Sequence, residues 1–297
     1  MTRRFRIVRL AVFVALVAVT TGCASINGLR DAQDAFNQAA TAETRAKESL
    51  TPSAFLGAVK PGTDADGRGV GGKATDPVGE VVRARAGYAA TIAAITKIEN
   101  DSKELGALKQ DKLLGVALTL KALAQWRLGL YEDAKATAEK AEQQAGDQLF
   151  PRDAALVKAL PGLIRNDEAF RKIYREWPND QRAQVFTEVI RLLDNAHASL
   201  NDARALAVTS DKNHPVLIYL IQAQLAGYQN RRDAYTRLGG KEPSTEEKKT
   251  AQGDYCALKG LLEALKPPGA VDTLADWRQQ LVLTEPQPGR PADVPCR

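Results

Sequence analysis

The stretch "ALAQWRLGLYEDAKATAEKA", residues 122–141, is the part of this 297-residue chain that most clearly indicates its fold. Gly129 separates two runs in which alanine recurs at helical spacing. Because small side chains at that spacing let helices approach closely, the stretch predicts two antiparallel helices joined by a short turn.

The same alanine-rich pattern extends over most of the chain. Apolar residues make up 44% of the sequence and aromatic residues only 6%, and no stretch shows the alternation typical of a strand. We therefore predict an all-α fold with prolines at the breaks between helices. The expected helices span residues 27–49, 80–100, 108–128, 131–146, 152–174, 180–208, 215–231, 245–266 and 271–283.

The helical region is expected over residues 23–283, as one helical array or as two small domains. Residues 51–79 hold three prolines and seven glycines and predict a flexible insertion. Residues 284–297 hold four prolines and predict an extended C-terminal tail.

The segment around residues 114–147 resembles a tetratricopeptide repeat (TPR). That family has small, turn-forming and packing residues at fixed positions of the repeat. This chain matches those positions with Ala122, Gly129, Tyr131, Ala134 and Ala141. The match has two departures: Ala138 stands where phenylalanine is usual, and the family's tryptophan motif is absent from the first helix. The pattern of the second helix recurs at Ala32, Phe36 and Ala39. The sequence between the two segments does not repeat strictly at the period of the family.

The resemblance implies a TPR-like antiparallel helical array, either an α-solenoid or an irregular bundle, which binds a partner in a concave groove. The alternative is a generic α-helical bundle that contains an alanine-rich hairpin. In a TPR-like unit the groove-facing positions are Thr119, Leu123, Trp126 and Arg127. An arginine beside a tryptophan is suited to holding a partner's carboxylate and apolar group together. The other interpretation places Trp126 in the core and leaves Arg127 solvated.

The N-terminus predicts export. Four arginines precede an apolar run at residues 10–19, which is too short to span a membrane but suits a signal peptide. Gly22 and Cys23, after small residues, resemble the lipobox of bacterial lipoproteins. That resemblance implies removal of residues 1–22 and a lipid, with palmitate, on Cys23. Because Ala24 is not the aspartate that retains lipoproteins in the inner membrane, we expect an outer-membrane anchor facing the periplasm.

Two alternatives remain open at the N-terminus. The segment is also compatible with an ordinary secretory peptide in which Cys23 is incidental. The pair Arg3 and Arg4 leaves open whether export uses the Sec or the twin-arginine route.

Loss of the signal peptide changes the charge of the chain. The whole sequence has 41 basic and 36 acidic residues, a net charge of +5. Four arginines leave with residues 1–22, so 37 basic residues face 36 acidic ones and the net charge becomes +1. We therefore expect no nucleic-acid partner.

Lipidation of Cys23 would leave Cys256 and Cys296 as an even pair in an oxidising compartment, and we predict a disulfide between them. Two free thiols, or a bond from Cys296 to a partner protein, are the alternatives.

The sequence offers no strong catalytic or cofactor motif. "GRGVGGKA", residues 67–74, matches the start of a phosphate-binding loop but has alanine where a magnesium-binding hydroxyl is required. A calcium loop in the same region would place Gly62 and Lys73 where carboxylates are needed. His197 and His214 suit packing and turn roles. We expect no nucleotide, metal or cofactor, and no enzymatic activity.

"YREWPND", residues 174–180, places Arg175 and Trp177 before a proline break. A packed indole at the end of a helix is the default interpretation, and a surface anchor for a partner is the alternative.

These observations predict a lipid-anchored periplasmic helical-repeat scaffold that binds a protein partner in a cell-envelope assembly or transport machine. The alternative is a solute-binding TPR accessory lipoprotein of a transporter. An enclosed pocket with converging polar residues would favour the solute binder, and an open groove with exposed aromatic residues would favour the scaffold.

Overall fold

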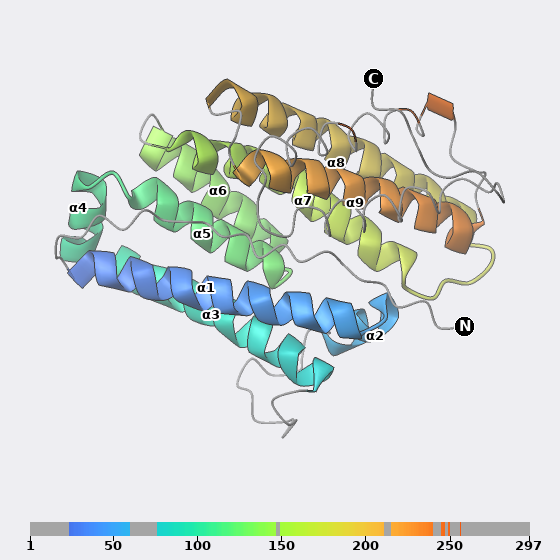
Figure 1. Cartoon of the computed structure of the whole chain (residues 1–297), viewed down its shortest axis with the longest axis horizontal. Helices are drawn as coiled ribbons and strands as arrows, with labels where there is room; N and C mark the ends of the chain where they lie inside the picture. The colour runs from blue at the N-terminus through green and yellow to red at the C-terminus, as the bar shows by residue number, and fades with distance from the viewer. Residues whose placement is uncertain are drawn as a thin grey trace. The chain divides into compact units, whose positions relative to one another are not determined.

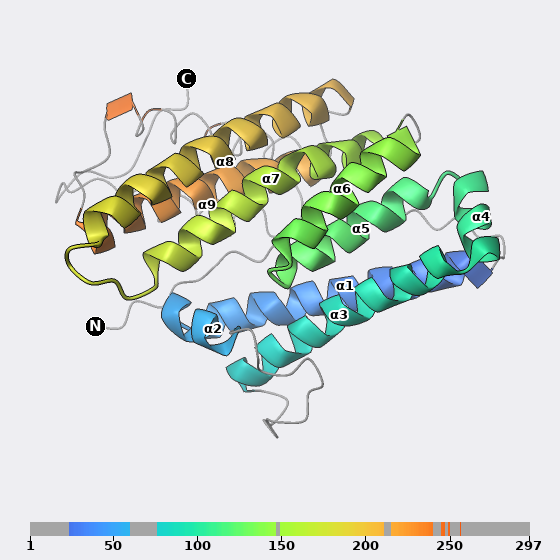
Figure 2. The same cartoon turned by 180° about the vertical axis from the view of Figure 1, so that it is seen from behind.

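The computed structural model describes residues 24–59, 76–146, 149–210 and 215–239, together with Thr245, Glu246, Lys249 and Cys256. All regular structure in these residues is helical and none of it is strand (Figures 1 and 2), so the all-α prediction is confirmed. The helices there are α1 (Ala24–Ser49), α2 (Pro52–Ala58), α3 (Pro77–Asn100), α4 (Ser102–Gln110), α5 (Leu114–Arg127), α6 (Tyr131–Ala145), α7 (Pro151–Ile173), α8 (Arg182–Ser210) and α9 (Pro215–Leu238).

The described residues fall into two compact units, which we call the N-terminal unit (24–160) and the C-terminal unit (161 onward). Helix α7 contributes residues 151–160 to the first unit and 161–173 to the second.

Helices α1 and α3 of the N-terminal unit lie side by side (Figures 1 and 2). The Thr91 hydroxyl donates to the carbonyl of Ala32 at 3.2 Å, and the Tyr88 hydroxyl donates to Glu43. Because the earlier residue of α3 contacts the later residue of α1, the two helices run antiparallel. Their close approach depends on Gly87, where an added Cβ would lie 2.8 Å from the Cβ of Ala39. An apolar stripe of α1 is buried in this seam. Its members are Leu29, Ala32, Phe36 and Ala39.

The turn between α5 and α6 has the geometry that the sequence predicted. Gly129 has φ +79°, a left-handed conformation that favours glycine, and the amide of Leu130 bonds the carbonyl of Gln125 at 2.9 Å. The amide of Gly129 bonds the carbonyl of Trp126 at 2.9 Å. These two bonds make a Schellman motif, which ends α5 and reverses the chain into α6.

Two local predictions differ from the structure. The predicted helix 108–128 is divided into α4 and α5, because Lys112 adopts φ 58° and ends α4 with the same pair of bonds found at Gly129. The predicted insertion at 51–79 begins with helix α2, whose first turn is capped by the Thr51 hydroxyl at 3.3 Å from the amide of Ala54. Asp76 caps α3 in the same way at 3.2 Å, so that α3 begins at Pro77. Residues 60–75 lie outside the described part.

The described helices of the C-terminal unit are α7 (from residue 161), α8 and α9. Arg165 donates to the Ser199 hydroxyl at 2.8 Å, which ties α7 to α8. Asn166 donates to the carbonyl of Ala223 at 3.1 Å, which ties α7 to α9. An apolar seam along α8 is buried, and its members are Val185, Val189, Leu193, Ala196, Leu200, Ala203 and Ala207.

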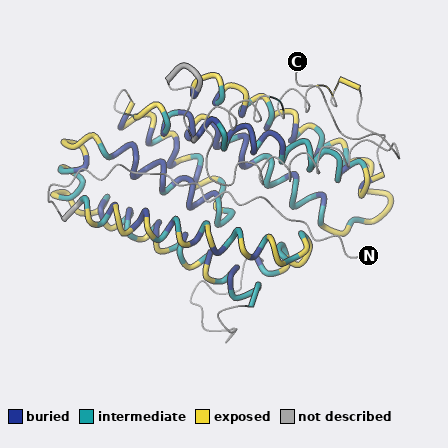
Figure 3. Tube along the Cα trace, in the orientation of Figure 1, coloured by how far each residue is buried: buried dark blue, intermediate teal, exposed yellow. Residues whose placement is uncertain are grey.

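Exposed and buried residues alternate along α1 and α3 in Figure 3, as expected of amphipathic helices. Helix α5 differs, because every residue from Leu114 to Trp126 except Lys121 is buried. A helix with no exposed stripe is a core element rather than a surface one.

Candidate functional site

Three of the four predicted groove positions do not lie on the surface. Thr119, Leu123 and Trp126 are 2%, 8% and 7% exposed, and all three belong to the buried helix α5. A buried side chain offers little area to a partner, so the structure gives no support to their assignment to a binding groove, which stays a prediction. For Trp126, the structure matches the alternative of core packing.

The fourth position, Arg127, is partly exposed and holds a carboxylate of the protein itself. Its Nη1 lies 3.2 Å from Oε1 of Glu43, and its guanidinium lies 4.1 Å from the ring of Trp126. The sequence predicted that this Arg–Trp pair would hold a partner's carboxylate. In the structure the carboxylate comes from α1.

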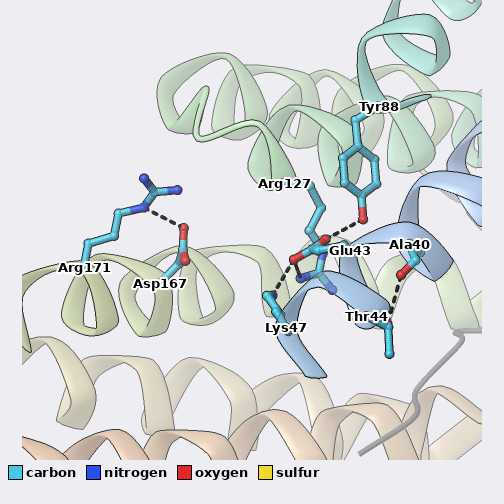
Figure 4. A network of polar contacts seen from close by, with 8 residues as sticks. All are labelled: Ala40, Glu43, Thr44, Lys47, Tyr88, Arg127, Asp167 and Arg171. Carbon is cyan, nitrogen blue, oxygen red and sulfur yellow. Dashed lines mark hydrogen bonds and ion pairs between the residues drawn. The ribbon is translucent and has the colours of Figure 1, made fainter. Parts of the chain in front are cut away.

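Glu43 lies at the centre of a buried ion cluster (Figure 4). Besides Arg127, the Tyr88 hydroxyl donates to Glu43 Oε2 at 2.6 Å, and Lys47 donates to Oε1. Burial alone would raise the pKa of Glu43, but Arg127 and Lys47 together with these hydrogen bonds lower it to about 2. Glu43 is therefore ionised at neutral pH and connects α1, α3 and α5.

A second carboxylate, Glu99 on α3, is held in a similar way. Lys121 on α5 and Lys140 on α6 each donate to one of its oxygens at 2.5 Å. Burial would raise the pKa of Glu99, but the hydrogen bonds and the positive charges of both lysines together lower it. Sequence reasoning did not identify either cluster, because only the Glu43–Lys47 pair has the i,i+4 spacing that a local search detects.

An open groove of about 980 Å³ lies on the N-terminal unit, along α3 and beside the α5–α6 turn. Its apolar lining consists of Ala89, Ile92, Ala93, Leu128 and Leu130. Its polar lining consists of Thr96, Lys97, Asn100, Asp101 and Ser102. Leu130 is 44% exposed, and it is one of the few large apolar side chains exposed in the described part of the chain.

Charge in this groove is concentrated at one end. Lys97 is exposed and forms no ion pair with the described residues. The nearby Asp101 is engaged, since its Oδ1 accepts the amides of Lys103 and Glu104 at 2.9 and 3.1 Å as the cap of α4. The groove thus combines an aliphatic surface with one available cation.

A smaller pocket of about 310 Å³ lies among α7, α8 and α9 of the C-terminal unit. Its polar lining comes from all three helices and from Glu246, and includes Asn166, Asp194, His197, Gln224, Tyr228 and Arg231. His197 is half-buried, and its Nδ1 lies 3.2 Å from the Tyr228 hydroxyl. The packing role predicted for His197 fits this contact, although the sequence gave no sign of the pocket.

A half-buried tyrosine–aspartate pair connects the residue that follows α7 with α9, away from this pocket. The Tyr174 hydroxyl donates to Asp233 Oδ2 at 2.6 Å, and the Arg237 guanidinium lies 4.7 Å from the Tyr174 ring. Burial raises the pKa of Asp233. The Tyr174 hydrogen bond and the neighbouring arginines lower it, but by less, so the pKa stays above its ordinary value. Burial and the Asp233 carboxylate also raise the pKa of Tyr174. The pair joins Tyr174, directly after α7, to the C-terminal part of α9.

The default interpretation of Trp177 fits the structure. Its Nε1 donates to the carbonyl of Lys172 at 2.8 Å, and its ring packs against the core of the C-terminal unit. The Arg175 guanidinium lies 4.8 Å from the ring. Trp177 therefore packs at the end of α7.

Several predicted features lie outside the described residues: the signal peptide with Cys23, the glycine-rich stretch 67–74, His214, Cys296 and the proline-rich tail. Cys256 is disulfide-bonded, and its partner also lies outside the described residues. The pairing of Cys256 with Cys296 stays a prediction. No group of metal-ligating side chains occurs in the described part of the chain.

The structure defines an all-α protein with a groove on one unit and a polar pocket in the other. The chain matches no protein-family model, and neither a curated protein nor a solved structure matches it. Among the described helices, none is both long and apolar enough to cross a membrane.

Proposed function

We propose that this chain is a lipid-anchored, periplasm-facing helical scaffold that binds a protein partner of the cell envelope. The observation that carries the proposal is the groove beside the α5–α6 turn, where Leu130 is 44% exposed next to a row of aliphatic side chains. Exposed apolar area with a polar rim is typical of protein-binding surfaces.

The lining defines the chemistry of the partner. Ile92, Leu128 and Leu130 are aliphatic, and the groove lacks the aromatic residues that a TPR-like scaffold was expected to expose. Lys97, exposed at one end, supplies a positive charge that no described residue neutralises. The partner segment that fits is short, with an aliphatic side chain for the groove and a carboxylate for Lys97.

The finer TPR-like assignment belongs to the same proposal. The α5–α6 hairpin supports it, because Ala134, Ala138 and Ala141 are buried on α6 and Gly129 makes the turn. The antiparallel pairing of α1 with α3 supports it as well, since Gly87 and Ala39 allow the close approach typical of such repeats. The groove then lies beside the hairpin, rather than on the face of α5 that the resemblance indicated.

Site-directed photocrosslinking in intact cells tests the proposal. A photoreactive amino acid replaces Ala93, which is exposed in the groove, and in a control strain it replaces Ala136, which is exposed on α6 outside the groove. We expect a discrete crosslinked protein from position 93 only. Mass spectrometry should locate the crosslink in a segment that contains both aliphatic and acidic residues.

A charge reversal then tests the role of Lys97. Lys97→Glu should abolish the crosslink, whereas Lys103→Glu, an exposed lysine of α4 that does not line the groove, should leave it unchanged. Equal crosslinking from positions 93 and 136, or equal effects of the two reversals, would contradict the proposed binding surface.

A further inference from the structure

The outward side of α3 does not have the composition of an ordinary exposed helix face. Residues 86–96 hold no charged side chain, although Ala86, Ala90 and Ala93 in this stretch are exposed. When a helix packs on the core with one face, its opposite face is normally charged or polar. The outward side of α3 therefore has the composition of a surface that another element covers.

The groove along this side does not suit a partner segment in an extended conformation. Its described lining comes from α3, from the start of α4 and from the α5–α6 turn, and contains neither a sheet edge nor an aromatic residue. A peptide that adds as a β-strand needs a sheet edge, and a polyproline segment needs an aromatic-lined groove. An extended segment would therefore leave its own backbone amides and carbonyls unpaired against the aliphatic wall.

A helical segment avoids this cost, because its backbone groups bond one another. The distance between two packed helices depends on the side chains at their contact, and short side chains allow the closest approach. Ala89 and Ala93 line the groove with one methyl group each, which leaves room for a helix along α3. Helix α1 already packs on α3 in this way, through Ala39 and Gly87.

Charge at one end of the groove specifies a further property of the segment. Lys97 lies one turn beyond Ala93, is exposed and forms no ion pair with the described residues. Asp101, the carboxylate of the described lining, is engaged as the cap of α4. The exposed residues of α3 include no carboxylate, so a second copy of the chain packed through the same face would not supply one. An acidic side chain on a partner helix would complement Lys97.

We propose that the groove binds its partner as an amphipathic α-helix that packs along α3, with aliphatic side chains against the alanines and a carboxylate beside Lys97. The lining residues of α3 run from Ala89 to Asn100, a rise of about 16 Å, so about three turns of a partner helix fit against them. The aliphatic side chains then recur at spacings of three and four residues. This inference rests on the proposed function and adds the conformation of the partner's segment.

Photocrosslinking in intact cells from the two ends of the groove measures that conformation. The photoreactive amino acid replaces Ala89 in one strain and Asn100 in another, and mass spectrometry locates the crosslinked residue of the partner in each. We expect the two crosslinked residues about eleven positions apart in the partner's sequence, because both helices rise about 1.5 Å per residue. An extended segment would separate them by about five positions, at about 3.3 Å per residue.

The outcomes distinguish this inference from the proposed function. A separation of about five positions overturns the helix and leaves the groove as a binding surface for a partner. Crosslinks to another copy of this chain, or to another segment of the same molecule, overturn the partner helix and the proposed function together. The absence of any crosslink from the groove does the same.

Synthetic peptides of the crosslinked partner segment provide a second test, with the full protein purified in detergent. In one peptide proline replaces a residue in the middle of the segment that carries no crosslink, and in the matched control alanine replaces the same residue. Because proline breaks a helix and alanine favours one, we expect the proline peptide to bind roughly a hundredfold more weakly by fluorescence anisotropy. Equal affinities of the two peptides overturn the helix.

Discussion

Arg127 Nη1 lies 3.2 Å from Glu43 Oε1, although the two residues are 84 positions apart in the chain. The pair joins α5 to α1, and the Tyr88 hydroxyl adds α3 to the same carboxylate (Figure 4). A residue that the sequence indicated as a contact for a partner is thus part of the internal framework of the N-terminal unit.

Replacing the central carboxylate should destabilise the protein. Glu43→Gln leaves Arg127 and Lys47 without their shared anion, and removal of one partner from a buried pair costs roughly 3–5 kcal/mol. Because both cations are about a quarter exposed, we expect a smaller loss, about 2–3 kcal/mol in the free energy of unfolding. Denaturant unfolding measures it.

The control for this variant is Glu132→Gln. Glu132 also pairs with a lysine, but its side chain is 87% exposed, so we expect a change of less than about 0.5 kcal/mol. Similar losses in the two variants would show that the burial of Glu43 has no energetic consequence.

The Glu43 cluster also predicts a pH dependence. The folded protein holds the pKa of Glu43 at about 2, below its ordinary value of 4.5, so ionised Glu43 contributes stability that is present above pH 4.5. That contribution is lost as the pH falls from 4.5 towards 2, and its full size is about 3 kcal/mol. Unfolding measured at several pH values should show wild type approaching Glu43→Gln as the pH falls. A constant difference between them would contradict the lowered pKa.

Two glycine substitutions should change stability in opposite directions. Gly87→Ala would place a Cβ 2.8 Å from Ala39 Cβ and 3.0 Å from the carbonyl of Ala35, which forces α1 and α3 apart. We expect a net loss of about 1–2 kcal/mol, since overpacking exceeds the gain in helix propensity. Gly106→Ala in α4 meets no atom within 4 Å and should stabilise the protein by up to about 1 kcal/mol. Thermal unfolding of both variants checks this, and a stabilised Gly87→Ala would show that α1 and α3 are not tightly packed.

Lipidation at Cys23 is expected from the N-terminal sequence. Cys23→Ala should abolish labelling with radioactive palmitate and release the protein to the soluble fraction, because the lipid is the only anchor that the sequence predicts. Fractionation of labelled cells measures both effects. Unchanged labelling would show that Cys23 is not the modified residue.

The disulfide of Cys256 is expected to join Cys296. Such a bond closes a loop of about 40 residues and would add roughly 4 kcal/mol by the chain-entropy estimate. Peptide mapping without reduction should recover a single cross-linked peptide pair that contains both cysteines. Recovery of Cys296 as a free thiol from periplasmic material would rule out this pairing.

Local chemistry in the sequence determined the helices and the α5–α6 turn. Alanine spacing indicates where helices pack, and Gly129 adopts the left-handed conformation that it tolerates best, so both features could be predicted from neighbours in the chain. The turn at Lys112 has the same geometry, but lysine rarely adopts positive φ, so the sequence carried no signal for the end of α4.

Tertiary structure alone decided which side chains are available for binding. Trp126 and Thr119 have the spacing of a TPR groove, yet α5 is enclosed and both are buried. Three features bring together residues from different helices. They are the Glu43 cluster, the groove that contains Lys97, and the pocket of the C-terminal unit that contains Asn166. Helical periodicity specifies which residues of one helix share a face, but it does not specify which other helix covers that face, and in this protein that covering determines both the core and the candidate sites.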